Sequence, residues 1–292
     1  MEHKAGYVSI IGSPNVGKST LMNVLIGEKL SIITHKAQTT RHRIMGIFSG
    51  EDFQIVYNDT PGILEPHYLL HKSMLAAVWS SIADADVILL VTEIGENFRH
   101  TEVLSKLKEM EGPVIVAINK IDLSEQDKVQ TAIKHWQSEL PRATVIPVSA
   151  LHCFNTASVF ETILSSLPVS PPFYPKEELT DRSQRFFVSE IIREKILLQF
   201  AQEIPYSVEV VVDTYKEEET ITRISAFLFV ARESQKAILL GHGGSSIKRL
   251  GTAARKDIEA FIDQHVFLEL IVKVKKDWRE NERDLKRFGY DL

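Results

Sequence analysis

The sequence predicts an α/β domain, with a mostly parallel sheet and helices on both faces, followed by a smaller α+β domain. Up to residue 167, apolar runs typical of buried strands alternate with segments of helical periodicity, which is the order of a parallel sheet with crossover helices. Residues 168–175 then contain four prolines, which neither a helix nor a central strand accommodates. After them, the order of helices and strands changes. We therefore expect a first domain over 1–167, a stiff linker over 168–184 and a second domain over 185–292.

The composition is that of a globular protein, since 44% of the 292 residues are hydrophobic, 25% are charged and the net charge is −5. No apolar stretch approaches the ~20 residues of a membrane span, and the first residues lack the apolar core of a signal peptide. The single cysteine, Cys153, excludes an intrachain disulfide and fits a reducing compartment. We expect a monomeric, cytoplasmic protein and interpret Cys153 as a small buried residue.

Six strands and five helices are predicted in the first domain. The run from Val87 to Val91 is apolar throughout, as in a strand buried on both faces. The strands are expected near 7–12, 44–49, 53–58, 86–92, 113–118 and 143–148, and the helices near 18–27, 68–82, 100–110, 125–139 and 156–166.

A phosphate-binding loop follows the first predicted strand. Residues 12–20 match G-x-x-x-x-G-K-[ST] between a strand and a helix, which is the context that this motif requires. Its backbone N–H groups bind phosphate oxygens together with the helix N-terminus. Lys18 would reach the β- and γ-phosphates, and the Ser19 hydroxyl would ligate Mg²⁺. The nucleotide contacts expected here come from Gly12, Asn15, Val16, Gly17, Lys18, Ser19 and Thr20.

A second loop, D-T-P-G, follows the strand predicted at 53–58. A carboxylate at a strand end can hold Mg²⁺, and the N–H of the final glycine can meet the γ-phosphate. The residues expected to contact nucleotide or metal are Asp59, Thr60, Pro61 and Gly62.

A third loop indicates which base is bound. Asn119, Lys120 and Asp122 follow a buried strand, and the Asp122 carboxylate can accept hydrogen bonds from guanine N1–H and the 2-amino group, donors that adenine lacks there. The Lys120 stem would lie against the base. The alternative for this loop is a strand-end turn in which Asp122 caps a helix. Ser149 and Ala150 follow the next strand, either as a further base-binding loop whose Ala150 N–H meets guanine O6 or as a plain strand end.

The second domain has the order of a type II KH domain. We expect a helix over 190–200, strands over 207–215 and 220–231, helices over 234–240 and 247–262, and a strand over 266–275. A G-x-x-G segment separates the last two helices. In KH domains this loop lets a nucleic-acid backbone approach; the alternative is a helix C-cap glycine and a turn. The expected RNA contacts are Gly241, His242, Gly243, Gly244, Lys248 and Arg249.

Three further segments complete a pattern that covers nearly the whole chain: Q-T-T-R-H-R at 38–43, I-P-Y-S-V at 204–208 and V-K-K-D-W-R at 274–279. Together with the loops above, they resemble the bacterial Era GTPases. The resemblance implies a GTP-hydrolysing ribosome-assembly factor whose KH domain binds the 3′ end of 16S ribosomal RNA in the 30S subunit. It also implies that Thr40, or as second choice Thr39, closes over Mg²⁺ and the γ-phosphate. Lys18, Thr40 and Gly62 are then the catalytic residues, and Ser19, Thr40 and Asp59 hold the metal.

No side chain is predicted to orient the attacking water, because Ile63 stands where Ras-type GTPases place a glutamine after D-x-x-G. We expect electrostatic stabilisation by the loop amides, Lys18 and Mg²⁺, and slow intrinsic turnover. Asn15 occupies the loop position that binds a potassium ion in related GTPases; the alternative is an ordinary turn residue.

Two other classes of function stay open on the sequence. One is a non-enzymatic RNA-binding module that only senses GTP. The other is a protein that associates peripherally with the inner face of the cell membrane, although interspersed acidic residues favour a solvated face. The basic residues concerned are Lys273, Lys275, Lys276, Arg279, Lys286 and Arg287.

Overall fold

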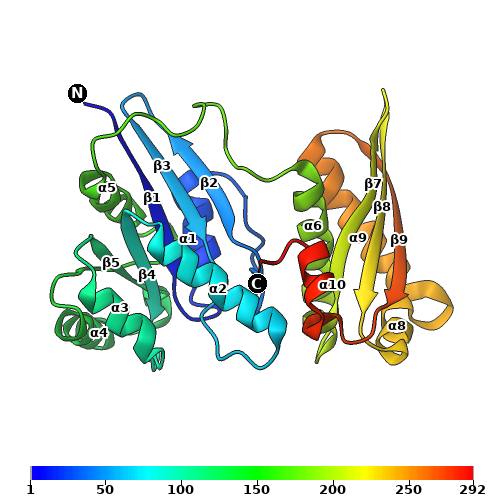
Figure 1. Ribbon diagram of the computed structural model, residues 1–292, viewed down its shortest axis with the longest axis horizontal. Coiled ribbons are helices and arrows are strands. Elements are labelled where there is room, and N and C mark those ends of the chain that lie inside the picture. Colours follow the sequence, from blue (N-terminus) through cyan, green and yellow to red (C-terminus); the bar gives the residue numbers. More distant parts are fainter. Residues whose placement is uncertain (1, 292) are drawn as a thin grey trace. The chain divides into compact units, whose positions relative to one another are not determined.

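The computed structural model describes residues 2–291, and contacts between residues divide these into two compact units. The first unit comprises the residues up to 66 and 74–181, and the second comprises 67–73 and the residues from 182 onward. Each unit contains the elements that the sequence predicts for its part of the chain (Figure 1).

The first unit is a six-stranded sheet with helices on both faces (Figure 1). The strand order is β2-β3-β1-β4-β5-β6, in which only the β2–β3 pair is antiparallel. The strands are β1 (Lys4–Ile11), β2 (Ile44–Ser49), β3 (Phe53–Asp59), β4 (Val87–Glu93), β5 (Val114–Asn119) and β6 (Thr144–Pro147). The helices are α1 (Lys18–Ile26), α2 (Leu69–Ala83), α3 (Thr101–Glu109), α4 (Gln126–Glu139) and α5 (Thr156–Ser166). The first turn of α2 groups with the second unit, and its residues from 74 onward belong to the first.

The central strands are apolar because both of their faces are covered. Every residue of β5 is buried, as are Val87 to Thr92 of β4. One face packs against α2, α3 and α4 through residues such as Val78, Leu107 and Trp136. The parallel strands all end at the same edge of the sheet, so the loops that follow β1, β3 and β5 are brought together there.

The proline-rich segment packs along the first unit as an extended chain. Val169 forms a β-bridge to Lys4, and the Leu179 carbonyl accepts a hydrogen bond from the Ile47 N–H at 2.8 Å. The buried Gln54 amide holds its middle: Oε1 accepts from the backbone N–H of Phe173, at 2.7 Å, and of Tyr174. These contacts explain why residues up to 181 group with the first unit.

The second unit is a three-stranded sheet covered by helices. The strand order is β7-β8-β9, with β7 antiparallel and β9 parallel to β8. The strands are β7 (Glu209–Glu217), β8 (Ile221–Val230) and β9 (His265–Val274), and the helices are α6 (Gln184–Gln199), α7 (Ile204–Ser207), α8 (Glu233–Leu240), α9 (Ser245–Ile262) and α10 (Glu282–Arg287). The α-β-β-α-α-β order expected from the sequence is confirmed.

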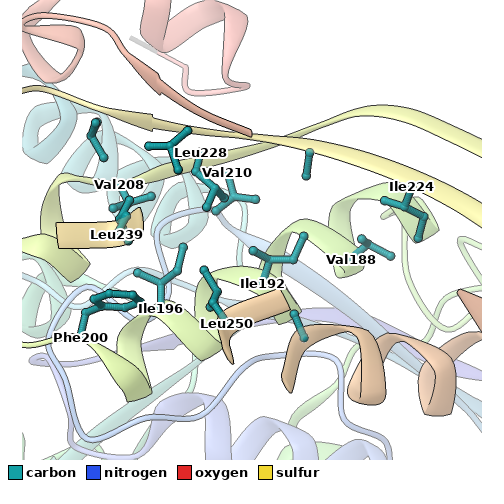
Figure 2. Packing of buried hydrophobic residues seen from close by; sticks show 14 of the residues in the cluster. Val188, Ile192, Ile196, Phe200, Val208, Val210, Ile224, Leu228, Leu239 and Leu250 are labelled. Carbon is teal, nitrogen blue, oxygen red and sulfur yellow. The ribbon is translucent and has the colours of Figure 1, made fainter. Parts of the chain in front are cut away.

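One apolar cluster holds this unit together (Figure 2). Helix α6 contributes Val188, Ile192 and Ile196, which repeat at helical spacing and are fully buried. Leu228 of β8 and Leu250 of α9 close the cluster from the sheet and from the second helix. The cluster fixes α9, and with it the G-x-x-G segment that precedes this helix.

The structure differs from the sequence predictions in several respects. Helix α6 begins at Gln184 rather than near residue 190, because the Ser183 side chain accepts a hydrogen bond from the Phe186 N–H and caps it. The short helices α7 and α10 were not predicted. Cys153 is exposed, and the prediction of a buried residue is wrong: it has a φ of 53° in the turn that joins β6 to α5, outside the core. Among the described residues, no helix is long and apolar enough to cross a membrane.

Candidate nucleotide and RNA sites

The predicted nucleotide-binding loops surround one cavity of about 500 Å³ at the carboxyl edge of the large sheet. Most of its polar lining comes from residues that the sequence singled out, and the segment 32–40 closes one side. The predicted residues that line it are Asn15, Gly17, Lys18, Ser19, Thr20, Thr40, Gly62, Asn119, Lys120 and Asp122.

The phosphate loop needs glycine at two positions because neighbouring strands pass very close to it. Gly12 has a φ of 147°, and a Cβ there would lie 2.1 Å from the Val91 carbonyl oxygen at the end of β4. Gly17 has a φ of 97°, and its Cβ would lie 2.2 Å from the Asn119 amide nitrogen. The ends of β4 and β5 therefore set the path of the loop.

Lys18 is buried under this loop. Its Nζ donates hydrogen bonds to the carbonyls of Gly12, at 3.1 Å, and Ser13, at 2.8 Å. Burial lowers the pKa of Lys18 to about 8, against the opposing effect of the Asp59 and Glu96 carboxylates. A phosphate in the cavity would stabilise the charged form of this ammonium, which burial disfavours.

Two of the predicted metal ligands, the hydroxyls of Ser19 and Thr40, converge on one carboxylate oxygen of the third, Asp59. Ser19 Oγ donates to Asp59 Oδ2 at 2.7 Å, Thr40 Oγ1 donates to the same oxygen at 3.3 Å, and the two hydroxyls are 2.9 Å apart. Thr39 is instead held within its own loop, where its Oγ1 donates to the Lys36 carbonyl at 2.6 Å. The geometry therefore favours Thr40 as the switch threonine.

This cluster fits a magnesium ion. Asp59 is fully buried, and its Oδ1 has no hydrogen-bond partner among the described residues. Burial raises the pKa of the Asp59 carboxyl, while the hydroxyl of Ser19 and the charge of Lys18 oppose the rise. One carboxylate and two hydroxyl oxygens are ligands that Mg²⁺ accepts, with the remaining positions left for phosphate and water.

The base-binding loops are joined by side-chain hydrogen bonds. Asn119 Nδ2 donates to the Val16 carbonyl at 2.8 Å, and Asn119 Oδ1 accepts from the Ala150 N–H at 2.9 Å. Ser149 Oγ donates to Asp122 Oδ1 at 2.5 Å. Asp122 lies inside a short 3-10 turn and caps no helix, because the helix that follows is capped at Glu125. The Ala150 N–H, assigned from the sequence to guanine O6, is here bonded to Asn119.

Ile63 is not among the residues that line the cavity. Its side chain is 2% exposed and packs in the core with Val78 and Val103, while its N–H donates to the Gly12 carbonyl at 3.0 Å. The residue therefore positions the D-T-P-G loop and cannot handle a proton or orient water.

The G-x-x-G segment of the second unit joins α8 to α9 in an open turn. Gly241, Gly243 and Gly244 have φ values of 71°, 56° and 78°, and a Cβ at either of the last two would meet nothing within 4 Å. His242 is exposed, and so are Lys248 and Arg249 on the first turns of α9. The backbone is thus accessible at the glycines, with two cations beside it.

Comparison with known proteins agrees with both sites. Residues 7–120 match the family described as 50S ribosome-binding GTPase, and residues 203–279 match the KH domain. GTPase Era of Staphylococcus epidermidis is 40% identical over 99% of this chain and 98% of its own length. GTPase Era of Syntrophus aciditrophicus is 43% identical over 99% of this chain and 95% of its own length.

The chain belongs to the Era GTPase family. It is therefore a GTP-hydrolysing enzyme with a KH domain, as the sequence predicted. A chloroplast relative from rice is 43% identical over 99% of this chain, which spans 70% of that protein.

Two solved Era structures share the fold over 99% of this chain at 38% identity. A crystal structure of Era in complex with MgGDPNP and nucleotides 1506–1542 of 16S ribosomal RNA superposes with a TM-score of 0.95. An Aquifex aeolicus Era variant bound to GDP and aluminium fluoride superposes with a TM-score of 0.94.

The guanine assignment predicts a switch in base preference. Replacing Asp122 with Asn exchanges an acceptor for an amide donor, which suits the extra carbonyl of xanthine. We expect Asp122→Asn to lose affinity for GDP and to gain affinity for xanthosine diphosphate (XDP). The parent protein should prefer GDP to ADP by up to ~10⁴-fold. Competition binding with GDP, XDP and ADP measures it. Comparable GDP and ADP affinities of the parent protein would contradict the assignment.

Proposed function

We propose that this protein uses a GTP cycle to control its binding to the 3′ region of 16S ribosomal RNA and so assists assembly of the 30S subunit. The proposal is carried by the presence of both sites in one chain: a cavity built for Mg²⁺ and a guanine nucleotide, and an accessible G-x-x-G turn beside Lys248 and Arg249. The complex of a similar Era protein with MgGDPNP and 16S nucleotides supports it.

We infer that hydrolysis depends on electrostatic stabilisation of the leaving phosphate. Lys18, already held by two loop carbonyls, supplies one fixed positive charge. A magnesium ion held by Ser19, Thr40 and Asp59 would supply another, and the Gly62 N–H would bind the γ-phosphate. Because the side chain of Ile63 is buried in the core, intrinsic turnover is expected to be slow.

We also propose a monovalent cation site at Asn15, as in related GTPases. Asn15 has a φ of 65°, lines the cavity, and donates from Nδ2 to the His35 carbonyl at 3.0 Å. Its own Oδ1 and this carbonyl are oxygens of the kind that bind K⁺. The bond also joins the phosphate loop to the segment that carries Thr40, so an ion there would stabilise the closed segment.

Hydrolysis assays on two variants test this mechanism. Lys18→Ala removes a charge-assisted contact worth roughly 1.5–3 kcal/mol, so we expect GTP affinity or turnover to fall by at least ~10-fold. Ile63→Val removes one buried methyl group, which should lower the free energy of unfolding by about 0.5–1.5 kcal/mol. It should leave turnover within about twofold of the parent rate. Loss of turnover in folded Ile63→Val would contradict the mechanism.

The same hydrolysis assay, with Na⁺ in place of K⁺, tests whether Asn15 binds a potassium ion. We expect turnover to fall in Na⁺ for the parent protein, and Asn15→Ala to remove the difference between the two ions. Equal turnover of the parent protein in both salts would contradict the proposed cation site.

Two remaining alternatives are less well supported. The family is one of GTP-hydrolysing enzymes, which disfavours a module that only senses GTP. For a membrane surface, at least three of the six basic residues near the C-terminus are engaged within the protein: Lys275 pairs with Asp284 at 2.9 Å, and Lys286 pairs with Glu282 at 2.7 Å. Lys273 lies over the Phe227 ring, 3.3 Å from its centre. We therefore propose that the protein works in the cytoplasm; that it is a monomer stays a prediction from the sequence.

The RNA site predicts loss of binding when acidic residues are placed in the G-x-x-G turn. In the double variant His242→Asp, Gly243→Asp, two carboxylates would face the phosphates, and aspartate tolerates the left-handed backbone of position 243. We expect single-stranded RNA binding to be abolished and GDP affinity to be unchanged. Binding by the parent protein should weaken with salt, with a slope of about −0.7 per phosphate neutralised.

A matched control is Ala201→Asp, Gln202→Asp, which adds the same two charges at an exposed turn of the same unit. Gln202 has a φ of 54°, close to the 56° of Gly243. This control should bind RNA like the parent protein. Undiminished RNA binding by the first double variant would place the RNA site elsewhere.

A further inference from the structure

Glu93 lies next to the base-binding loop although no motif includes it. It is the last residue of β4, and in the parallel register with β5 it is the partner of Asn119. Its carboxylate therefore reaches across to the residue that follows Asn119. Glu93 Oε2 pairs with Lys120 Nζ at 2.5 Å, and both side chains are about one-third exposed, at 37% and 35%.

A tight turn fixes the position of Glu93. The Glu96 side chain folds back, so that its Oε2 accepts from Thr92 Oγ1 at 2.6 Å and from the Glu93 N–H at 3.2 Å. The Glu96 N–H donates to the Glu93 carbonyl at 3.2 Å, and Gly95 supplies the left-handed φ of 78° that the turn requires. Because Thr92 is fully buried, this turn is anchored to the sheet.

Lys120 is held at both ends. Its backbone has a φ of 60°, and the 3-10 turn Ile121–Leu123 begins directly after it. Its side chain lines the nucleotide cavity, whereas Glu93 is absent from the lining. The hydrocarbon stem of Lys120 thus runs along the cavity wall between a fixed Cα and an ammonium that is bound outside the cavity.

We propose that Glu93 is a positioning residue for nucleotide binding, because it holds the Lys120 side chain along the cavity wall, where its stem can pack against the guanine face. The inference rests on the proposed base-binding role of Lys120. A free lysine side chain samples many rotamers and loses this freedom when it packs on a ligand. Glu93 restricts the side chain before the nucleotide arrives, so less entropy is lost on binding.

The role has a specific kinetic signature. GDP and GTP carry the same base, so both should lose the same factor in affinity when Glu93 is removed. The γ-phosphate would lie at the phosphate loop, with Lys18 and Gly62, and not at the base-binding loop, so kcat should not change. A partly exposed ion pair of this kind predicts a change of about three- to fivefold in Kd.

The test is a double-mutant cycle on the full-length protein. Glu93→Ala, Lys120→Ala and the double variant are compared with the parent protein by the Kd values of GDP and GTP and by kcat. We expect Glu93→Ala to raise both Kd values three- to fivefold at unchanged kcat, and to have no further effect in the Lys120→Ala background. Glu93→Gln, which keeps a hydrogen-bond acceptor, should have a smaller effect.

Glu139→Ala is the matched control, because it breaks another ion pair of the same unit, Lys108–Glu139 at 3.1 Å, that does not line the cavity. It should leave the Kd of GDP, the Kd of GTP and kcat unchanged. The proposal is overturned if Glu93→Ala leaves Kd unchanged, or if it weakens binding equally with and without Lys120. A parent protein that does not prefer GDP over ADP would instead overturn the base-binding assignment itself.

Discussion

The nucleotide site depends on the two hydrogen bonds of the Asn119 amide. Its Nδ2 donates to the Val16 carbonyl of the phosphate loop, and its Oδ1 accepts from the Ala150 N–H of the last base-binding loop. The side chain is 3% exposed, so neither bond competes with water. One buried amide thus joins three loops that leave three different strands. It also passes so close to Gly17 that no other residue fits there.

The charges of the site are unfavourable for the protein alone and favourable with a ligand. Lys18 and Asp59 are both buried, and burial disfavours the charged form of each. The hydroxyls of Ser19, Ser31 and Thr40 all bond to Asp59 Oδ2, which leaves its other oxygen without a partner among the described residues. A magnesium–phosphate pair would satisfy both groups. The site is therefore arranged for charges that the nucleotide brings.

The sequence was informative where backbone geometry dictates residue type. Gly12 and Gly17 are dictated by close approach, and the strand ends by continuous apolar runs, so the fold was predicted correctly and the predicted loops come together around one cavity. Positions determined by tertiary contact were missed. Glu93 acquires its role only from the register of β4 with β5. The turn before α10 is anchored by Trp278, whose Nε1 donates to the Ser207 carbonyl and whose ring packs on that of Phe288 at the end of α10, contacts that no local pattern reveals.

The GDP affinity of Asn119→Asp tests the central role of this amide most directly. The carboxylate keeps an acceptor for the Ala150 N–H but places an oxygen against the Val16 carbonyl, so a buried hydrogen bond is replaced by repulsion. We predict a Kd at least ~10-fold higher, because leaving a buried polar group unpaired costs about 1–3 kcal/mol. Asn155→Asp, which loses a similar bond to the Pro147 carbonyl outside the cavity, is the control. If folded Asn119→Asp binds GDP within threefold of the parent protein, Asn119 does not hold the loops together.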